Sequence, residues 1–194
     1  WFLRLEAFPV CHALLDDPRF FSLLLRIDQE LAAQTQSKGC ACSGPLHCAN
    51  YPRKPRGYPP QARDSVERRL SFCCDRCRKR TTSPSVRFLG RRVYMSVAVL
   101  LSSSRHAGSN SAARLASQLG IAWHTLRRWR AWWQESFVRT PLWLAAVGEF
   151  MPPLDVARLP EALIDRFVGA DAAERLSAAL RFLAPLTVRG DHAA

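Results

Sequence analysis

Long apolar runs are missing from this chain, and so is a recognisable secretory signal. The apolar run from Val97 to Leu101 is far too short to span a bilayer. We therefore expect a cytoplasmic protein without a membrane span, in which disulfides are uncommon. The chain begins with Trp1 rather than Met, which predicts a fragment or a trimmed chain.

Acidic residues are scarce over the middle of the chain. The 194 residues carry a net charge of +12, but from Lys38 to Arg139 there are 20 Lys and Arg against 4 acids, a net of +16. The two flanks together are net −4. A solvated basic face normally mixes the two signs of charge. Charge of one sign over this length instead predicts a polyanion as partner.

Cysteine is concentrated in two short clusters that hold six of the seven cysteines. Cys74 and Cys77 form a C-x-x-C knuckle, whose two thiolates can turn back on one ion. Cys40 and Cys42 form a C-x-C pair beside two glycines, which let the backbone fold closely around a metal. The sequence therefore predicts a structural Cys₄ zinc site.

Three further residues leave alternatives to that ligand set. Cys48 could replace Cys40, His47 is a second spare, and Cys73 adjoins a ligand without the reach to share its metal easily. All of these cysteines could also be ordinary buried thiols of a reduced protein.

Basic residues surround the two cysteine clusters. Arg78, Lys79 and Arg80 follow the second knuckle directly. The stretch from Tyr51 to Pro60 reads as an extended loop that carries Arg53, Lys54 and Arg56 between two tyrosines. Such interleaving suits backbone contact with base stacking, although a rigid solvated linker would look the same.

Strands and helices are expected on either side of this loop. Arg68 to Phe72 alternates as a short strand would, with Ser85 to Phe88 as its possible partner. Residues 1–37 are predicted to be helical, with Asp17 as N-cap and Pro18 at the first helical position.

A helix-turn-helix pattern follows in residues 93–139. Ala112, Leu115, Ala116 and Leu119 share one helical face, and Gly120 supplies a tight turn before Ile121. A second helix from Trp123 to Gln134 takes the recognition role. Its expected outward positions are Trp123, His124, Arg127, Arg128 and Arg130. A plain helical hairpin with a solvated arginine face is the alternative.

Residues 140–194 are predicted to be a helical tail. Pro141 and Pro160 each open a short helix, and Asp171 caps a third whose inner face runs from Ala172 to Leu183. We expect a packing or dimerisation role for this tail.

The segments LHCANYPRKPRG and RRLSFCCDRCRKRTTSPSVRFLGRRVY, followed by AARLASQLGIAWHTLRRWRAWW, resemble the small zinc-ribbon plus helix-turn-helix proteins encoded by bacterial mobile elements. They are similar to the N-terminal DNA-binding portion of insertion-sequence transposases, over about residues 38–137. The resemblance implies binding of terminal-repeat or target DNA. The chain departs from the usual pattern in its C-x-C first knuckle, and a catalytic domain does not follow.

Catalysis by the chain itself is not expected. A carboxylate-type transposase needs three acids converging on two metal ions. The basic centre offers only Asp64, Glu67, Asp75 and Glu135, none of them on a strand-like apolar run. The acids of the tail fall on helices with surface spacing; these are Asp155, Glu161, Asp165, Asp171 and Glu174.

Together these patterns predict a mainly α fold with a small β zinc ribbon, in which helical flanks surround a zinc-ribbon and helix-turn-helix centre. The expected parts are an N-terminal helical segment at 1–37, the ribbon at 38–92, the helix-turn-helix at 93–139 and the helical tail at 140–194. The expected function is zinc-dependent binding of duplex DNA in a bacterial cytoplasm, with a transposase or a second copy as protein partner. The alternatives are an RNA-binding zinc-ribbon protein and a transcriptional regulator unrelated to transposition.

Overall fold

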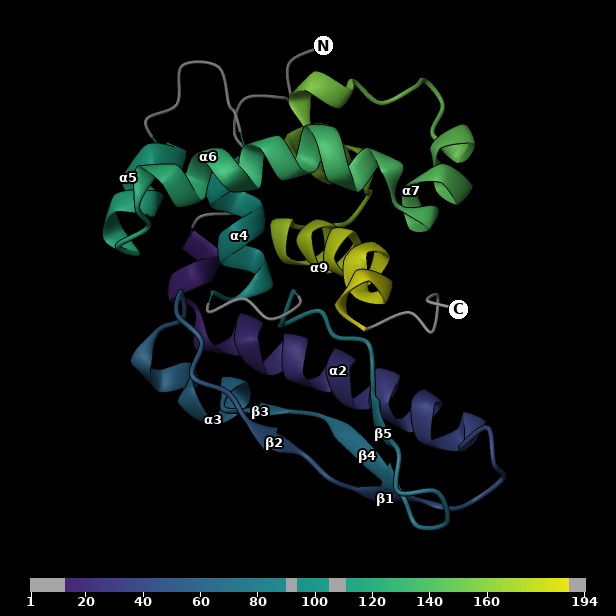
Figure 1. Cartoon of the computed structure of the whole chain (residues 1–194). Helices are drawn as coiled ribbons and strands as arrows, with labels where there is room; N and C mark the ends of the chain where they lie inside the picture. The colour runs from purple at the N-terminus through teal and green to yellow at the C-terminus, as the bar shows by residue number, and fades with distance from the viewer. Residues whose placement is uncertain (1–12, 90–93, 105–110, 189–194) are drawn as a thin grey trace. The chain divides into compact units, whose positions relative to one another are not determined.

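The computed structural model describes residues 13–89, 94–104 and 111–188. These residues are mainly helical, with a small antiparallel sheet (Figure 1). They divide into two compact units. Among the described residues, the helical unit comprises 13–16, 97–104 and 111–179, and the cysteine unit comprises 17–89, 94–96 and 180–188.

Helix α2, Pro18–Lys38, begins where the sequence predicts. The carboxylate of Asp17 accepts the backbone N–H of Arg19 at 2.9 Å, and Pro18 occupies the first helical position. The predicted N-terminal helix is confirmed from Pro18 on, whereas residues 1–12 lie outside the described part of the chain. The buried apolar face of α2 consists of Phe20, Phe21, Leu24, Ile27 and Ala32.

The cysteine unit contains a three-stranded antiparallel sheet in the order β1-β4-β5. Its strands are β1 Leu46–Cys48, β4 Ser71–Cys74 and β5 Arg80–Thr82. Leu46 stands opposite Cys74 in the register, and both side chains are buried. Strand β4 therefore ends at Cys74, a candidate metal ligand, which packs in one apolar cluster with Leu46 and Phe72.

The predicted partner of the Arg68–Phe72 strand is wrong. That stretch divides between β4 and a two-residue strand β3, Arg68–Arg69, which pairs with β2, Tyr51–Pro52. Pro52 is tolerated there because β2 lies at the edge of a two-stranded sheet. Beyond β2 a 3-10 turn η2, Pro60–Ala62, leads into the short helix α3, Arg63–Val66.

Residues 85–88 bind a buried carboxylate instead of forming a strand. The Asp28 carboxylate of α2 accepts the Arg87 Nε–H at 2.7 Å, the Val86 N–H at 2.7 Å and the Ser85 hydroxyl at 2.6 Å. Arg87 also donates to the carbonyls of Ser65 and Arg68. Every polar group of this buried ion pair is thus partnered, which is the condition under which a buried pair is tolerated.

The C-terminal segment also packs within the cysteine unit. A 3-10 turn η7, Ala184–Thr187, brings the Thr187 hydroxyl to the Ser85 N–H at 2.9 Å and to Arg69 at 3.3 Å. Arg69 is buried, and its burial lowers the pKa of its guanidinium, against the opposing effect of Asp28. Thr187 therefore links the segment at Ser85 to strand β3.

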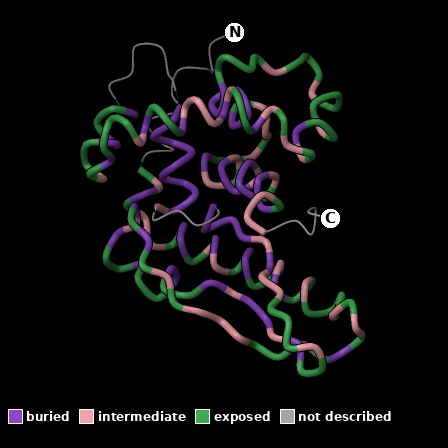
Figure 2. Tube along the Cα trace, in the orientation of Figure 1, coloured by how far each residue is buried: buried purple, intermediate pink, exposed green. Residues whose placement is uncertain are grey.

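The helical unit is built on a buried helix α4, Ser96–Ser103. Residues from Val97 to Ser104 are all buried, as Figure 2 shows along this segment. The Trp133 ring is fully buried, and its polar group, the indole N–H, donates a hydrogen bond to the Ser103 hydroxyl at 2.8 Å. The apolar run from Val97 to Leu101 is thus part of the buried helix of this unit.

Helices α5, Ser111–Gln118, and α6, Trp123–Ala131, follow with a short turn between them (Figure 1). Gly120 adopts a positive φ of 60°, which a glycine accepts without strain. Ile121 is buried after it, and its N–H donates to the Ala116 carbonyl at 2.8 Å. Ala122 gives α6 no side-chain cap, as its sequence indicates.

Short helices complete the helical unit. A π-helical turn, Trp132–Ser136, extends α6. An edge-to-face contact joins Trp133 to Phe137, and a tilted contact joins Phe137 to Trp143. The predicted openings at Pro141 and Pro160 and the cap at Asp171 are present. The remaining elements are 3-10 turns η1 Leu14–Asp16, η4 Phe137–Arg139, η5 Val147–Glu149 and η6 Val156–Arg158, and helices α7 Pro141–Ala146, α8 Glu161–Arg166 and α9 Ala172–Leu183.

Candidate metal centre

The two cysteine pairs meet at one end of the three-stranded sheet. Cys40 and Cys42 follow the end of α2, whereas Cys74 closes β4 and Cys77 lies in the turn to β5. Their sulfurs lie 3.5 Å apart for Cys40 and Cys77, and 3.4 Å apart for Cys42 and Cys74. All four sulfur atoms lie within 4.8 Å of one another. These separations exceed the ~2.0 Å of a disulfide bond, and the cysteines are free thiols.

The backbone of both pairs folds in the same way around the sulfurs. The Ser43 N–H donates to the Cys40 carbonyl at 2.8 Å, and the Arg78 N–H donates to the Cys74 carbonyl at 3.0 Å. Both Ser43 and Arg78 take a positive φ, 59° and 58°. Two non-glycine residues in this sparsely populated region indicate that the local structure holds the turns tightly.

Gly44 leaves room for the sulfurs that a side chain would fill. A Cβ at this position would lie 2.7 Å from the Cys74 sulfur and 3.3 Å from the Cys42 sulfur. The same atom would lie 2.7 Å from the Cβ of Arg76. The absence of a Cβ thus lets the first cysteine pair approach the second.

Hydrogen bonds move the pKa values of Cys74 and Cys42 in opposite directions. The backbone N–H of Cys77 is the main cause that lowers the pKa of Cys74 from 9.0 to about 6. For Cys42 the backbone N–H of Gly44 acts to lower the pKa, but hydrogen bonds with the Cys74 and Cys77 sulfurs outweigh it and raise the pKa to about 12. Of these two thiols, Cys74 is therefore the one that is ionised near neutral pH.

Four cysteine sulfurs in this arrangement can hold one metal ion. The group consists of the four cysteines singled out from the sequence and includes none of the three spares, His47, Cys48 and Cys73. Cys48 is exposed on β1, and the Cys73 sulfur lies against the carbonyls of Cys74 and Arg78.

Basic side chains around the cluster differ in how far they are engaged. Arg78 and Lys79 are exposed, and Arg78 makes only a 4.0 Å contact with Asp75. Arg80 is exposed, but its Nη1 donates to the Ala49 carbonyl and to the Ser71 hydroxyl. These bonds connect β5 to the first residue of β4 and to the residue that follows β1.

Arg76 is a basic residue that sequence reasoning missed. It is exposed, and its Nη1 donates to the Cys42 carbonyl at 3.2 Å, which joins the second cysteine turn to the first. Its position in the sequence could have indicated a contact with the cluster, because a residue between Cys74 and Cys77 lies next to the candidate ligands.

The basic residues of the predicted loop lie apart from this turn in sequence. Lys54 and Arg56 are exposed, whereas Arg53 is half-buried with its guanidinium 5.5 Å from the centre of the Phe88 ring. Arg56 also contributes backbone contacts, since its carbonyl accepts the Met95 N–H.

The residues selected on α6 belong to the helical unit. Trp123, His124, Arg127 and Arg128 are exposed, while Leu126 and Trp129 on the same helix are buried. Arg130 is half-buried, with its guanidinium 6.0 Å from the centre of the Trp123 ring. The helix therefore presents an aromatic and cationic face on an apolar base.

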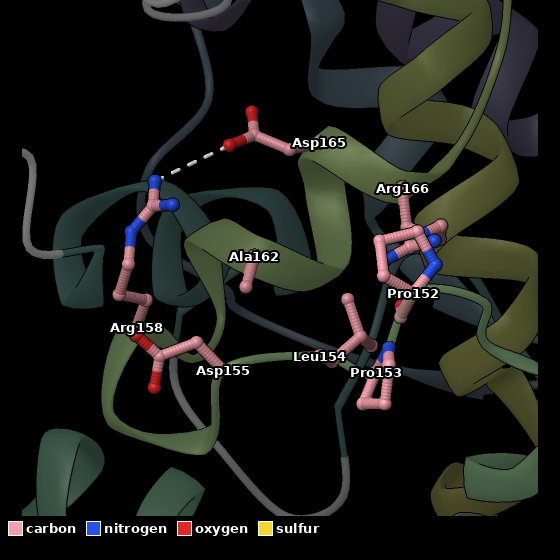
Figure 3. A pocket seen from close by; sticks show the side chains of 8 residues that line it. All are labelled: Pro152, Pro153, Leu154, Asp155, Arg158, Ala162, Asp165 and Arg166. Atoms are coloured by element: carbon pink, nitrogen blue, oxygen red, sulfur yellow. Dashed lines mark hydrogen bonds and ion pairs between the residues drawn. The ribbon is translucent and has the colours of Figure 1, made fainter.

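A pocket in the helical unit lies between the loop at Pro152 and Pro153 and helix α8 (Figure 3). The Arg158 guanidinium faces Asp165 across it, with Nη2 and Oδ2 3.4 Å apart, and also pairs with Glu161, which raises the pKa of Arg158. The Asp155 carboxylate caps η6 by accepting the Ala157 N–H at 2.9 Å. These acidic side chains thus contribute to local capping and ion pairing.

The chain matches no protein-family model, no curated protein and no solved structure. Within the described ranges, none of the helices is both long enough and apolar enough to cross a membrane.

Proposed function

We propose that this chain is a zinc-dependent DNA-binding protein, transposase-like or transposase-associated, that recognises duplex DNA. The observation that carries the proposal is the outer face of α6, where Arg127, Arg128 and His124 are exposed beside Trp123. Leu126 and Trp129 anchor the opposite face of the helix. An anchored helix with arginines outward suits the major groove, where arginine pairs bidentately with guanine.

In this proposal α5, the turn at Gly120 and α6 form a helix-turn-helix with α6 as recognition helix. The exposed α6 arginines then read base edges, whereas basic residues of the cysteine unit hold phosphates and carry no sequence information. Arg78 and Lys79 are exposed beside the cluster, and Lys54 and Arg56 are exposed on the loop. Arg76 joins this group as a contact that sequence reasoning did not select.

Zinc is the metal that fits the four-cysteine donor set best. Tetrahedral zinc with Zn–S bonds of about 2.3 Å places its sulfurs about 3.8 Å apart, close to the 3.4 Å and 3.5 Å separations of the cluster. Gly44 provides the space that the ligands need. When bound, zinc would cross-link the end of α2 to the β4–β5 turn and make the module a zinc ribbon.

The test is a selection of binding sites from random duplexes, repeated with variants. Arg127→Ala is expected to lower the ratio of specific to random affinity by roughly 5- to 150-fold, the equivalent of one good base contact. Arg114→Ala, an exposed arginine on α5, is the matched control and should leave the selected site unchanged.

Two outcomes would count against the proposal. If Arg127→Ala selects the same site with the same preference, α6 is not the reading helix. If structured RNA competes as well as duplex DNA for the wild-type protein, the RNA-binding alternative holds, because A-form RNA closes its major groove to such a helix.

A further inference from the structure

An exposed tryptophan stands at the first position of α6. Trp123 is 64% exposed, and among the exposed large apolar side chains of the described residues it is the aromatic one. The other tryptophan of this helix, Trp129, is only 3% exposed. Packing in the helical unit therefore does not account for an indole at position 123.

The indole is presented on a firm support. The Arg130 guanidinium lies over the ring, 6.0 Å from its centre, and Trp123 is still 64% exposed. The helix that carries both residues is anchored by the burial of Leu126 and Trp129. Such a ring loses little conformational freedom when a ligand stacks on it.

The charge around the ring selects the kind of ligand. Arg127, Arg128 and His124 are exposed on the same helix. A planar apolar face within a cationic surface suits a group that is flat and attached to negative charge. A nucleobase with its flanking phosphates has that chemistry.

We propose that Trp123 is a stacking platform for an unpaired nucleobase, so that the preferred ligand is DNA with a base outside the helical stack. Bases inside a continuous duplex have both faces covered by their neighbours and cannot stack on an indole without being extruded. This inference rests on the proposed function and specifies its substrate class. Arg127 and Arg128 keep the base-reading role of the proposed function, and their positive charge favours the negatively charged backbone on either side of the stacked base.

The experiment compares three labelled DNAs of the same sequence at one salt concentration: a continuous duplex, the duplex with a single unpaired thymine, and the single strand. Binding is measured by fluorescence anisotropy. Wild-type protein is expected to bind the duplex with the unpaired thymine roughly 5- to 100-fold more tightly than the continuous duplex, the range for one base stacked on an aromatic side chain.

Substitutions assign that preference to the ring. Trp123→Ala should abolish it, and Trp123→Phe should retain part of it because a smaller aromatic face remains. Leu144→Ala, at an exposed apolar side chain of α7 that is 63% exposed, should leave it unchanged. Far-ultraviolet circular dichroism of each variant checks that the fold is kept.

The outcomes separate the two proposals. If wild-type protein binds all duplexes equally, or if Trp123→Ala keeps the preference, the stacking platform is refuted while duplex binding by α6 stands. If no DNA is bound, both are refuted. If Trp123→Ala weakens binding to every DNA by the same factor, the ring makes a general duplex contact and the inference fails.

Discussion

Individual thiols in the cysteine cluster differ because of the hydrogen bonds that each sulfur accepts. Cys74 receives the backbone N–H of Cys77 and closes a buried strand end. At Cys42 the backbone N–H of Gly44 acts to lower the pKa, but hydrogen bonds with the Cys74 and Cys77 sulfurs together outweigh it. A thiolate is the form that binds metal. Cys74 therefore reaches the metal-binding thiolate form at a lower pH than Cys42 does.

The acidity of Cys74 leads to a prediction for the metal-free protein. Its folded pKa of about 6 lies below the ordinary 9.0. The thiolate therefore stabilises the metal-free fold fully above pH 9, and this contribution is lost as the pH falls through about 6. Ultraviolet absorbance of thiolate is expected to show one group titrating near pH 6.

Cys74→Ser should remove that titration, and Cys48→Ser, at an exposed thiol outside the cluster, should keep it. A titration near pH 6 that survives in Cys74→Ser would mean that another cysteine carries the charge.

Gly44 supports a second prediction at the scale of one residue. In Gly44→Ala the new Cβ would lie 2.7 Å from the Cys74 sulfur, so the cluster must shift. Overpacking of this kind costs about 1–3 kcal/mol. We expect wild-type protein purified without chelator to carry about one zinc per chain, and Gly44→Ala to lose zinc to a competing chelator at lower chelator concentration.

The matched control is Gly148→Ala, where an added Cβ meets nothing within 4 Å. Equal zinc retention in both variants would show that the close approach at Gly44 does not matter for the metal.

Helix α6 has two tryptophans with opposite roles. Trp129 packs in the helical unit at 3% exposure, whereas Trp123 lies 64% exposed at the start of the helix. Their spacing of six positions puts them on different sides of an α-helix. The element thus separates the residues that hold it in place from those that can meet a ligand.

Alanine substitutions of Trp129 and Trp123 are expected to differ in their effect on the free energy of unfolding. Trp129→Ala is expected to lower the free energy of unfolding by about 3–5 kcal/mol, through lost burial and the cavity left behind. Trp123→Ala should change it by less than about 0.5 kcal/mol. Urea unfolding followed by circular dichroism measures both. Equal effects would show that the assignment of the two faces is incorrect.

The charge of the whole molecule is concentrated in residues 38–139, which carry a net +16 within a total of +12. This region supplies residues to both compact units. If both contact the same DNA, several phosphates are neutralised at once. The release of their counterions then makes affinity fall steeply with salt.

We predict that raising salt from about 50 to 200 mM weakens DNA binding by about 10²- to 10³-fold, as about four to six phosphate contacts require. Arg78→Ala should reduce the slope of log affinity against log salt by about one. Arg26→Ala, at an exposed arginine of α2 outside the basic centre, should not change it. Affinity that does not depend on salt would contradict a phosphate-contacting surface.

The sequence by itself determined the features that depend on neighbours along the chain. Asp17 and Pro18 start α2 because a cap and a fixed φ act within one helical turn. The inner face of α9, with Leu176, Leu180 and Leu183, follows from helical periodicity alone. The grouping of four cysteines was predictable because ligand spacing within each pair is local chemistry.

Only the tertiary structure decided which distant segments meet. Ser85 was expected in a strand, but its hydroxyl binds Asp28, 57 positions away. No local sequence pattern distinguishes Asp28 from an exposed polar residue of a helix. Its burial depends on the ion pair with Arg87, which is distant in sequence. The same holds for the bond from Arg76 to Cys42. Burial and hydrogen bonding between segments far apart in sequence set these properties, and such contacts are established only when the chain has folded.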